Sequence, residues 1–412
     1  MQTRLASWAR GTTQGEQAEA ILRRCVHCGF CAATCPTYLE LGDERDSPRG
    51  RIYLIKQVME GASPSASTQQ HLDRCLTCRN CETTCPSGVA YGELLDLGRQ
   101  AVAERLARPW PQRLQRWLLR HAVTSPAFGP AVRLAQALRQ ALPPSWRAKV
   151  PARRPAGALP QVGHHARQVL LLDGCAQPGM MPSIDAATIR VLDALGIGAS
   201  MAPGAACCGA LSFHLDAQAA ALEQMRANVD AWWPLLQAGG AEALVINASG
   251  CGAMIKEYAR HLRDDPDYAD KAAYVVERVR DLAELIAPQA AQLAPRLGQA
   301  PVAAFHPPCT LQHWQGLREV NEQLLRALGF VLQPFGDEHL CCGSAGAYAL
   351  LQPDLSGRLR QRKLAAIEAA QPQVILSANV GCIGHLQAGT QTPVRHWIEV
   401  LDQRLSAGPA RA

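Results

Sequence analysis

The sequence predicts an α/β protein with an N-terminal α-helical domain, a helical linker and two pseudo-symmetric α/β lobes with parallel sheets. Three observations support this prediction. The 16 cysteines of the 412 residues fall into two groups, before residue 90 and after residue 170. The second group repeats one spacing twice, and short apolar runs alternate with helical patterns around that repeat, as expected for parallel sheets. We place the domains at residues 1–105, 106–165, 166–295 and 296–412.

The composition is that of a folded, soluble chain. Apolar residues make up 48% and charged residues 18%, and the length allows two or three domains. No apolar run is long enough to span a membrane, and residues 1–10 lack the apolar core of a secretory signal. We therefore expect a cytoplasmic protein, in which thiols stay reduced and clustered cysteines indicate metal binding rather than disulfides.

The first cysteine group consists of two runs with one spacing. CVHCGFCAATCP begins at Cys25 and CLTCRNCETTCP begins at Cys75, and both read C-x2-C-x2-C-x3-C-P. This is the bacterial ferredoxin pattern for [4Fe–4S] clusters, in which the fourth cysteine of each run ligates the other cluster. The predicted ligands are Cys25, Cys28, Cys31 and Cys85 for cluster 1, and Cys75, Cys78, Cys81 and Cys35 for cluster 2.

Zinc is the alternative reading of these cysteines. Zinc sites usually take two C-x2-C pairs about 15–20 residues apart, which two complete runs with trailing prolines do not match. His27 lies between ligands, and we interpret it as a solvated neighbour. Residues 16–24 and 49–60 have helical patterns, and Ser47-Pro48 is a typical helix start. A mostly helical two-cluster domain is therefore expected, suited to passing single electrons.

The linker carries most of the positive charge. Residues 99–167 contain 13 Arg and Lys against one acid, Glu104, whereas the whole chain has a net charge of +6. Residues 113–120 (RLQRWLLR) form a basic amphipathic segment. It is interpreted as a connector that docks on an acidic partner, with peripheral contact to the inner face of the cytoplasmic membrane as a further hypothesis. No nucleic-acid-binding motif accompanies the charge.

The second cysteine group is an internal repeat. A single cysteine precedes a C-C-G triplet by 32 positions in both copies, and another single cysteine follows each triplet. The repeat residues are Cys175, Cys207, Cys208 and Cys251 in the first copy, and Cys309, Cys341, Cys342 and Cys382 in the second.

Strand and helix patterns repeat around these cysteines. Strands are predicted at 168–172, 243–246, 274–276, 301–305, 373–376 and 394–396, and helices at 184–195, 279–286, 317–328 and 398–405. The cysteines follow the carboxyl ends of strands, where open α/β sheets bind their ligands. Each set of four thiols could hold an Fe–S cluster or zinc. The alternative is that these cysteines bind no metal and pack as small apolar side chains.

At these motifs the chain resembles the iron–sulfur subunits of bacterial glycolate oxidases (glycolate dehydrogenases), nearly end to end. The segments that carry the resemblance are CVHCGFCAATCPTYLELGDE, SPRGRIYLIKQVMEG, HLDRCLTCRNCETTCPSGV, LCCGSAGAYAL and VRHWIEVL. The C-C-G repeats resemble those of heterodisulfide reductases. Subunits of anaerobic glycerol-3-phosphate dehydrogenase and of the lactate-utilisation system share this layout.

One departure from the heterodisulfide reductase pattern is informative. That pattern ends in C-x2-C, whereas this chain has Met254 and His385 in place of the last cysteine. The departure argues against non-cubane clusters and disulfide-reducing activity. His385 and His306 are candidate replacement ligands in the second lobe.

The resemblance implies a place in an FAD-dependent 2-hydroxyacid dehydrogenase. Separate flavin subunits would oxidise glycolate to glyoxylate, and this chain would relay the electrons to a quinone or another acceptor. The chain has no G-x-G-x-x-G fingerprint for a flavin or NAD, so we expect no catalytic residues in it. The alternatives are a subunit of a related lactate or glycerol-3-phosphate dehydrogenase, a heterodisulfide-reductase-like enzyme acting at the C-C-G sites, and a zinc-stapled binding module.

Overall fold

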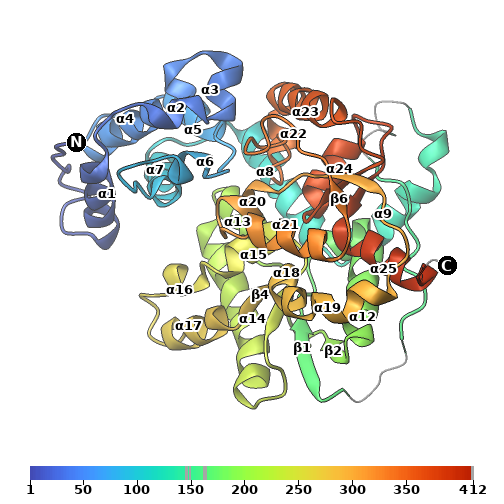
Figure 1. Ribbon diagram of the computed structural model, residues 1–412. Coiled ribbons are helices and arrows are strands. Elements are labelled where there is room, and N and C mark those ends of the chain that lie inside the picture. The colour runs from blue at the N-terminus through green and yellow to red at the C-terminus, as the bar shows by residue number, and fades with distance from the viewer. Residues whose placement is uncertain (144–146, 148–149, 161–164, 410–412) are drawn as a thin grey trace. The chain divides into compact units, whose positions relative to one another are not determined.

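A computed structural model describes residues 1–143, 147, 150–160 and 165–409 (Figure 1). Positions 144–146, 148–149 and 161–164 of the predicted linker lie outside the described residues. The chain divides into two compact units. Unit 1 comprises Met1–Trp117 and Asp337–Lys363, and unit 2 comprises Leu118–Gly336 and Leu364–Ala412. Residues 337–363, which the sequence analysis placed in the second lobe, thus group with the N-terminal cysteine runs.

Unit 1 is built from helices. They are α1 (Thr13–Arg24), α2 (Phe30–Ala33), α3 (Pro36–Leu41), η1 (Glu44–Asp46), α4 (Pro48–Met59), α5 (Ala66–Asp73), α6 (Asn80–Thr83), α7 (Tyr91–Arg105), α22 (Tyr348–Leu351), and parts of α8 (Trp110–Thr124) and α23 (Pro353–Glu368). The helices predicted at 16–24 and 49–60 are confirmed as α1 and α4. Helix α4 starts as expected, because the Ser47 hydroxyl accepts a hydrogen bond from the Gly50 N–H at 3.0 Å and Pro48 occupies its first turn.

The core of unit 1 forms where α4 packs on α7. Leu22, Ile55, Leu94 and Leu95 are fully buried there. The two helices approach closely at Gly98, where an added Cβ would lie 2.5 Å from Ile55 Cγ1. Glycine at this position therefore sets the spacing of the two helices that follow the cysteine runs in the sequence.

Unit 2 contains two four-stranded parallel sheets of the same topology. One has the order β2-β1-β3-β4 and the other β6-β5-β7-β8. The strands are β1 (Arg167–Leu171), β2 (Ile197–Ser200), β3 (Leu244–Ile246), β4 (Val279–Asp281), β5 (Val302–Phe305), β6 (Val331–Leu332), β7 (Val374–Ser377) and β8 (Val394–His396). The matching orders confirm the predicted fold class and the internal repeat.

The helices of unit 2 flank these sheets (Figure 1). They are α9 (Phe128–Ala137), η2 (Arg139–Ala141), α11 (Gln177–Met180), α12 (Ser183–Ala194), α13 (Ala210–His214), α14 (Gln218–Gln237), α15 (Ser249–Ile255), α16 (Tyr258–His261), α17 (Ala269–Glu277), α18 (Leu282–Ile286), η3 (Ala287–Gln289), α19 (Ala290–Leu293), η4 (Ala294–Arg296), α20 (Cys309–Gln312), α21 (Arg318–Ala327), α24 (Val380–Gln387) and α25 (Trp397–Ala407). Across the described residues, no helix combines the length and apolarity needed to cross a membrane.

The strand predicted at 274–276 is wrong. These residues belong to helix α17, where Ala272 and Val275 lie three positions apart and are both buried. The strand is β4, residues 279–281, in which Val279 and Asp281 are buried and Arg280 is exposed. The closing helix α18 accordingly begins at Leu282 rather than at 279. The short edge strands β2 and β6 were not predicted.

Candidate metal centre

The structure gathers the eight N-terminal cysteines around two cavities in unit 1. Each cavity is lined by three cysteines of one run and the last cysteine of the other. The first has Cys25, Cys28, Cys31 and Cys85 at its wall, with Cys81 also in reach, and the second has Cys35, Cys75, Cys78 and Cys81. All 16 cysteines lie among the described residues, and their thiols are free of disulfides. Four sulfurs around a cavity are the donor set that a [4Fe–4S] cluster requires.

The two runs wrap their second cysteine with the same backbone turn. His27 and Gly29, on either side of Cys28, have φ of 60° and 87°. Thr77 and Arg79, on either side of Cys78, have φ of 52° and 58°. Left-handed residues are uncommon outside glycine, so their recurrence at equivalent positions indicates a backbone shape that the chain maintains for these thiols.

The first cavity opens to solvent. Cys28 is exposed, Cys31 and Cys85 are partly buried, and Phe30 beside them is 62% exposed. His27 Nδ1 lies 3.0 Å from Met1 Sδ, in keeping with a neighbour rather than a ligand. Burial raises the pKa of Cys31 to about 11, so this thiol is neutral without metal and loses its proton when it ligates one.

The second cavity is lined by more deeply buried thiols than the first. Its four cysteines are all buried, and burial raises the pKa of Cys78 and Cys81. Cys75 Sγ accepts hydrogen bonds from the Tyr91 hydroxyl at 3.6 Å and from the Thr77 N–H at 3.4 Å. The sequence analysis did not identify Tyr91, which lies outside both cysteine runs.

The second C-C-G triplet lies beside the second cavity, within unit 1. The Asn80 side chain, next to Cys81, donates to Thr34 O at 3.0 Å and to His339 O at 3.1 Å. The Tyr348 hydroxyl donates to Arg74 O at 3.0 Å. Cys341 is close enough that its charge, after burial, helps to raise the pKa of Cys78.

A buried lysine accompanies this triplet. Lys363 is 2% exposed and donates to Asp337 O and Glu338 O. Burial lowers the pKa of Lys363 to about 8, against the opposing effect of the Cys342 and Cys341 thiolates. A cation at this position favours the thiolate forms of both cysteines.

The four cysteines of the first lobe form one hydrogen-bonded chain of thiols. Cys175 bonds to Cys207, Cys207 to Cys208, and Cys208 to Cys251. The bonds from Cys175 and Cys208 lower the pKa of Cys207, while the same bonds raise the pKa of Cys175 and Cys208. They meet because β1, β2 and β3 are neighbours in a parallel sheet and each is followed by part of the set.

Two buried side chains hold the C-C-G loop of this lobe. Asn228 accepts from the Ala206 N–H at 2.9 Å and donates to Cys207 O at 2.8 Å and to the Tyr258 hydroxyl oxygen at 3.1 Å. The Tyr258 hydroxyl donates to Cys208 O at 2.8 Å. Asn228 lies in α14, 21 residues from Cys207, and Tyr258 begins α16, 50 residues from Cys208, so no local motif predicted them.

Met254 and His306 differ in whether they lie close to a cysteine sulfur that could bind metal. Met254 is 1% exposed and belongs to the hydrophobic core of the first lobe, so it packs rather than faces a metal. His306, directly after β5, is 1% exposed, and one of its ring nitrogens lies within 4.8 Å of Cys382 Sγ. Cys309 begins α20, and Cys382 and His385 lie in α24.

Comparison with known proteins identifies both the N-terminal cysteine runs and the two C-C-G lobes. Residues 21–89 match a family described as a 4Fe-4S dicluster domain, and residues 169–256 and 303–387 each match a cysteine-rich domain. The glycolate oxidase iron-sulfur subunit of Escherichia coli (strain K12) is 52% identical over 98% of this chain and 99% of its own length. The chain belongs to the family of glycolate oxidase iron–sulfur subunits.

More distant relatives share this layout. A probable glycolate oxidase iron-sulfur subunit of Bacillus subtilis (strain 168) is 31% identical over 90% of both chains. Lactate utilization protein A of Bacillus licheniformis is 24% identical over 58% of this chain and all of its own length. As a member of this family, the chain is an iron–sulfur subunit of an oxidoreductase complex that carries [4Fe–4S] clusters.

Proposed function

We propose that this chain relays electrons from flavin-binding subunits, which oxidise glycolate to glyoxylate, through two [4Fe–4S] clusters to a quinone or another acceptor. The observation that carries the proposal is the crossed set of cysteines around each cavity of unit 1. The clusters supply one-electron chemistry, and the protein fixes their position and surroundings. The names of the E. coli and B. subtilis relatives support glycolate as the substrate of the complex.

The ligand assignment follows the cavities. We assign Cys25, Cys28, Cys31 and Cys85 to cluster 1, and Cys75, Cys78, Cys81 and Cys35 to cluster 2. The test uses anaerobically reconstituted chain and the variants Cys85→Ala and Cys35→Ala. Wild-type protein should hold about eight irons. Cys85→Ala should alter the same EPR signal as Cys28→Ala, and Cys35→Ala the same signal as Cys78→Ala. If each fourth cysteine instead affects the cluster of its own run, the crossed assignment is wrong.

The substrate is tested on the complex rather than on the chain. With its flavin subunits present, the complex should reduce a quinone faster with glycolate than with lactate or glycerol 3-phosphate. The reconstituted chain alone should oxidise none of the three. Turnover of glycolate by the isolated chain would contradict the relay role, and a preference for lactate would identify a related dehydrogenase.

The first lobe supports a second proposal, a further metal or Fe–S site. The observation that supports this proposal is the set of hydrogen bonds that links Cys175, Cys207, Cys208 and Cys251. Cys207→Ser should reduce the bound metal below the wild-type content without changing either ferredoxin-type EPR signal. Loss of zinc would identify a structural site, and loss of iron a third cluster. An EPR signal that appears only on oxidation with a substrate thiol would favour heterodisulfide-reductase-like chemistry. Equal metal contents would contradict the site.

We assign the same role to the second set, Cys309, Cys341, Cys342 and Cys382, by the repeat. The burial of His306 and its closeness to Cys382 Sγ make it a candidate ligand alongside these thiols. Imidazole suits zinc and iron alike. Cys382→Ser and His306→Ala should each lower the metal content, whereas Met254→Leu in the first lobe should not.

We further propose that the chain is cytoplasmic and contacts the inner face of the membrane through α8. Trp110, Leu114, Trp117 and Leu118 follow helical spacing on one face, and all four are between 45% and 71% exposed. The segment carries basic residues and no acid. Exposed aromatic and basic side chains on one helix are typical of binding to an anionic lipid surface.

Sedimentation with vesicles tests this contact. The chain should bind phosphatidylserine-containing vesicles more than pure phosphatidylcholine vesicles, and salt should weaken the binding. Trp117→Ser should reduce binding. Leu350→Ser, at a side chain 50% exposed outside α8, is the matched control and should bind as wild type does. Absence of salt-sensitive binding would leave α8 as a solvated connector.

A further inference from the structure

Helix α4 reaches both cluster cavities with two arginines that differ completely in environment. Pro48, in its first turn, lines both cavities, Arg49 lines the first and Arg51 the second. Arg49 is partly exposed and pairs with Glu44 at 2.7 Å. Arg51 is 1% exposed and is among the largest fully buried side chains of the chain. The two positions are two residues apart, so they lie on different sides of the helix.

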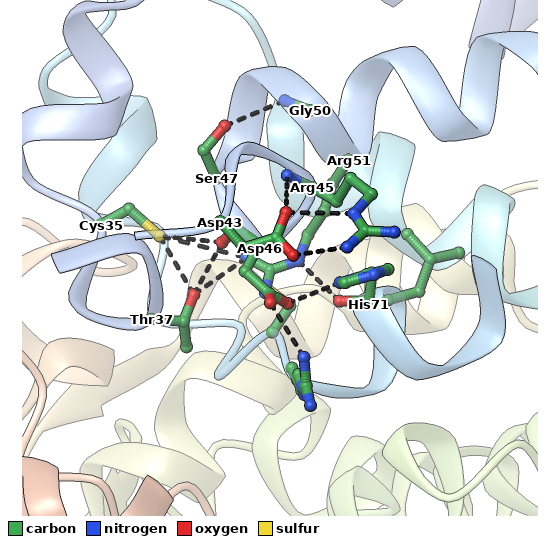
Figure 2. Close-up of polar contacts among 12 residues, drawn as sticks. Cys35, Thr37, Asp43, Arg45, Asp46, Ser47, Gly50, Arg51 and His71 are labelled. Carbon is green, nitrogen blue, oxygen red and sulfur yellow. Dashed lines mark hydrogen bonds and ion pairs between the residues drawn. The ribbon is translucent and has the colours of Figure 1, made fainter. Parts of the chain in front are cut away.

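The buried guanidinium of Arg51 is fixed by a dense set of contacts, shown in Figure 2. Its Nε donates to His71 O at 2.7 Å, Nη2 to Asp46 Oδ1 at 3.2 Å, and Nη1 to Thr37 Oγ1 at 3.1 Å. Nη1 also lies 4.0 Å from Cys35 Sγ. These three partners come from different elements, so a turn of the guanidinium would break all three hydrogen bonds.

Asp46 does not cancel this positive charge. Its carboxylate also accepts from Arg74 Nη1 at 3.0 Å and lies 3.0 Å from His71 Nδ1. Two guanidinium groups thus share one carboxylate, and the network keeps a net positive charge. Low dielectric strengthens the effect of that charge on a neighbouring group.

Hydrogen bonds to the cysteine sulfurs add to the asymmetry of the two sites. Thr37 Oγ1 lies 3.2 Å from Cys35 Sγ, and the Tyr91 hydroxyl donates to Cys75 Sγ. The hydroxyl of Thr37 also reaches Asp46 O at 2.8 Å, so it can turn to the sulfur when Cys35 is a thiolate that only accepts. Net charge, hydrogen bonds to sulfur and solvent exposure are the levers that set cluster potentials.

We propose that Arg51, held by Asp46 and His71, is a positioning residue that raises the reduction potential of cluster 2 above that of cluster 1. With both clusters bound, one electron would pass from the first site, oxidising it, to the second, reducing it, and no bond or proton would be exchanged. Reduction adds one negative charge beside a fixed cation, which the partly exposed, ion-paired Arg49 does not supply equally at the first site. The electron would therefore rest at the second site, whose four cysteines are all buried. This inference rests on the proposed ligand assignment.

The test is a potentiometric EPR titration of the reconstituted full chain. Arg51→Met should lower the potential of one signal so that its reduced-to-oxidised ratio at the wild-type midpoint falls at least tenfold, which is about 59 mV for one electron. The other signal should not move. The signal that moves should be the one altered by Cys78→Ala. Arg49→Met, two residues along the same helix, is the matched control and should leave that signal in place.

Two further variants separate tuning from folding. Arg51→Lys keeps the charge and should retain part of the wild-type potential. Thr37→Val removes the hydroxyl near Cys35 Sγ but keeps both charges of the Arg51–Asp46 pair, and it should lower the same potential. Iron content of each variant is measured alongside. If wild-type protein lacks two cluster signals, the proposed function fails. If it shows both and Arg51→Met and Thr37→Val move neither, or move both equally, the tuning inference alone is overturned.

Discussion

Removing the Asp46 carboxylate should destabilise unit 1 strongly. Asp46 is completely buried and is the carboxylate partner shared by Arg51, which is 1% exposed, and Arg74, which is 26% exposed. Asp46→Ala leaves the Arg51 charge buried with no carboxylate partner. Breaking a buried ion pair in this way costs about 3–5 kcal/mol. For a unit of this size the loss corresponds to a fall of roughly 10–15 °C in the apparent melting temperature.

Thermal unfolding followed by circular dichroism measures this loss, in both iron-loaded and iron-free protein. Because the broken contacts are between protein groups, the fall should appear in both forms. Asp43→Ala is the matched control beside the same 3-10 helix. Its carboxylate pairs with Arg45 at the surface, so its melting temperature should stay near wild type. If Asp46→Ala melts within about 3 °C of Asp43→Ala, the buried pair does not stabilise the unit as argued.

Three further changes test other parts of the structure. Gly98→Ala would place a methyl group 2.5 Å from the buried Ile55, and this overpacking should cost about 1–3 kcal/mol in denaturant unfolding. Asn228→Ala removes three hydrogen bonds around the first C-C-G loop and should lower the free energy of unfolding by about 1–3 kcal/mol. The same variant should bind less metal in the first lobe. Burial lowers the pKa of His396 to about 4, below its unfolded value. Its contribution to the free energy of unfolding should therefore be fully present above pH 6.5 and be lost as pH falls towards 4. The loss should approach about 3 kcal/mol, and the difference in unfolding free energy between wild type and His396→Gln should shrink by that amount over this window.

The pH prediction depends on the hydrogen bonds of one imidazole. His396 Nε2 donates to Asn247 O at 2.9 Å, and Nδ1 accepts from the Ile398 N–H at 3.2 Å. Protonation would turn Nδ1 into a donor that faces another donor. Asp185 and Asp281, whose pKa burial raises to about 6, titrate in the opposite sense, so the comparison must be made against the His396 variant. A difference that does not change with pH would show that the imidazole has the same pKa in the folded and unfolded states.

Local spacing made the 4Fe-4S dicluster domain and most elements predictable. Both cysteine runs have the ferredoxin spacing, and helix α4 has its cap and first-turn proline in the sequence. The repeat predicts that the two sheets share one topology, as they do. The error at residues 274–276 has a non-local cause. Tyr-Val-Val suits a strand by its side chains, but Ala272 and Val275 pack one helical face against the core, and packing outweighed propensity.

The surroundings of the cysteines could not be predicted, because they assemble from distant segments. Asn228 and Tyr258 reach the first C-C-G loop from α14 and α16. Residues 337–363 leave their own lobe in sequence to pack with unit 1. No spacing rule in a single sequence reports such pairings, since each depends on how separate elements meet.

The two N-terminal cysteine runs are alike in their local sequence and differ in the residues that surround their sulfurs. They share one spacing and one backbone turn, at residues 27–29 and 77–79. Ligand type and cluster type are therefore the same at both sites, and neither can make one potential differ from the other. Any difference must come from charge, hydrogen bonds and exposure around the sulfurs. Those differ through Arg51, Thr37 and Tyr91, none of which belongs to a ligand motif. The direction of electron flow in this chain is thus decided by residues that the cysteine motif does not contain.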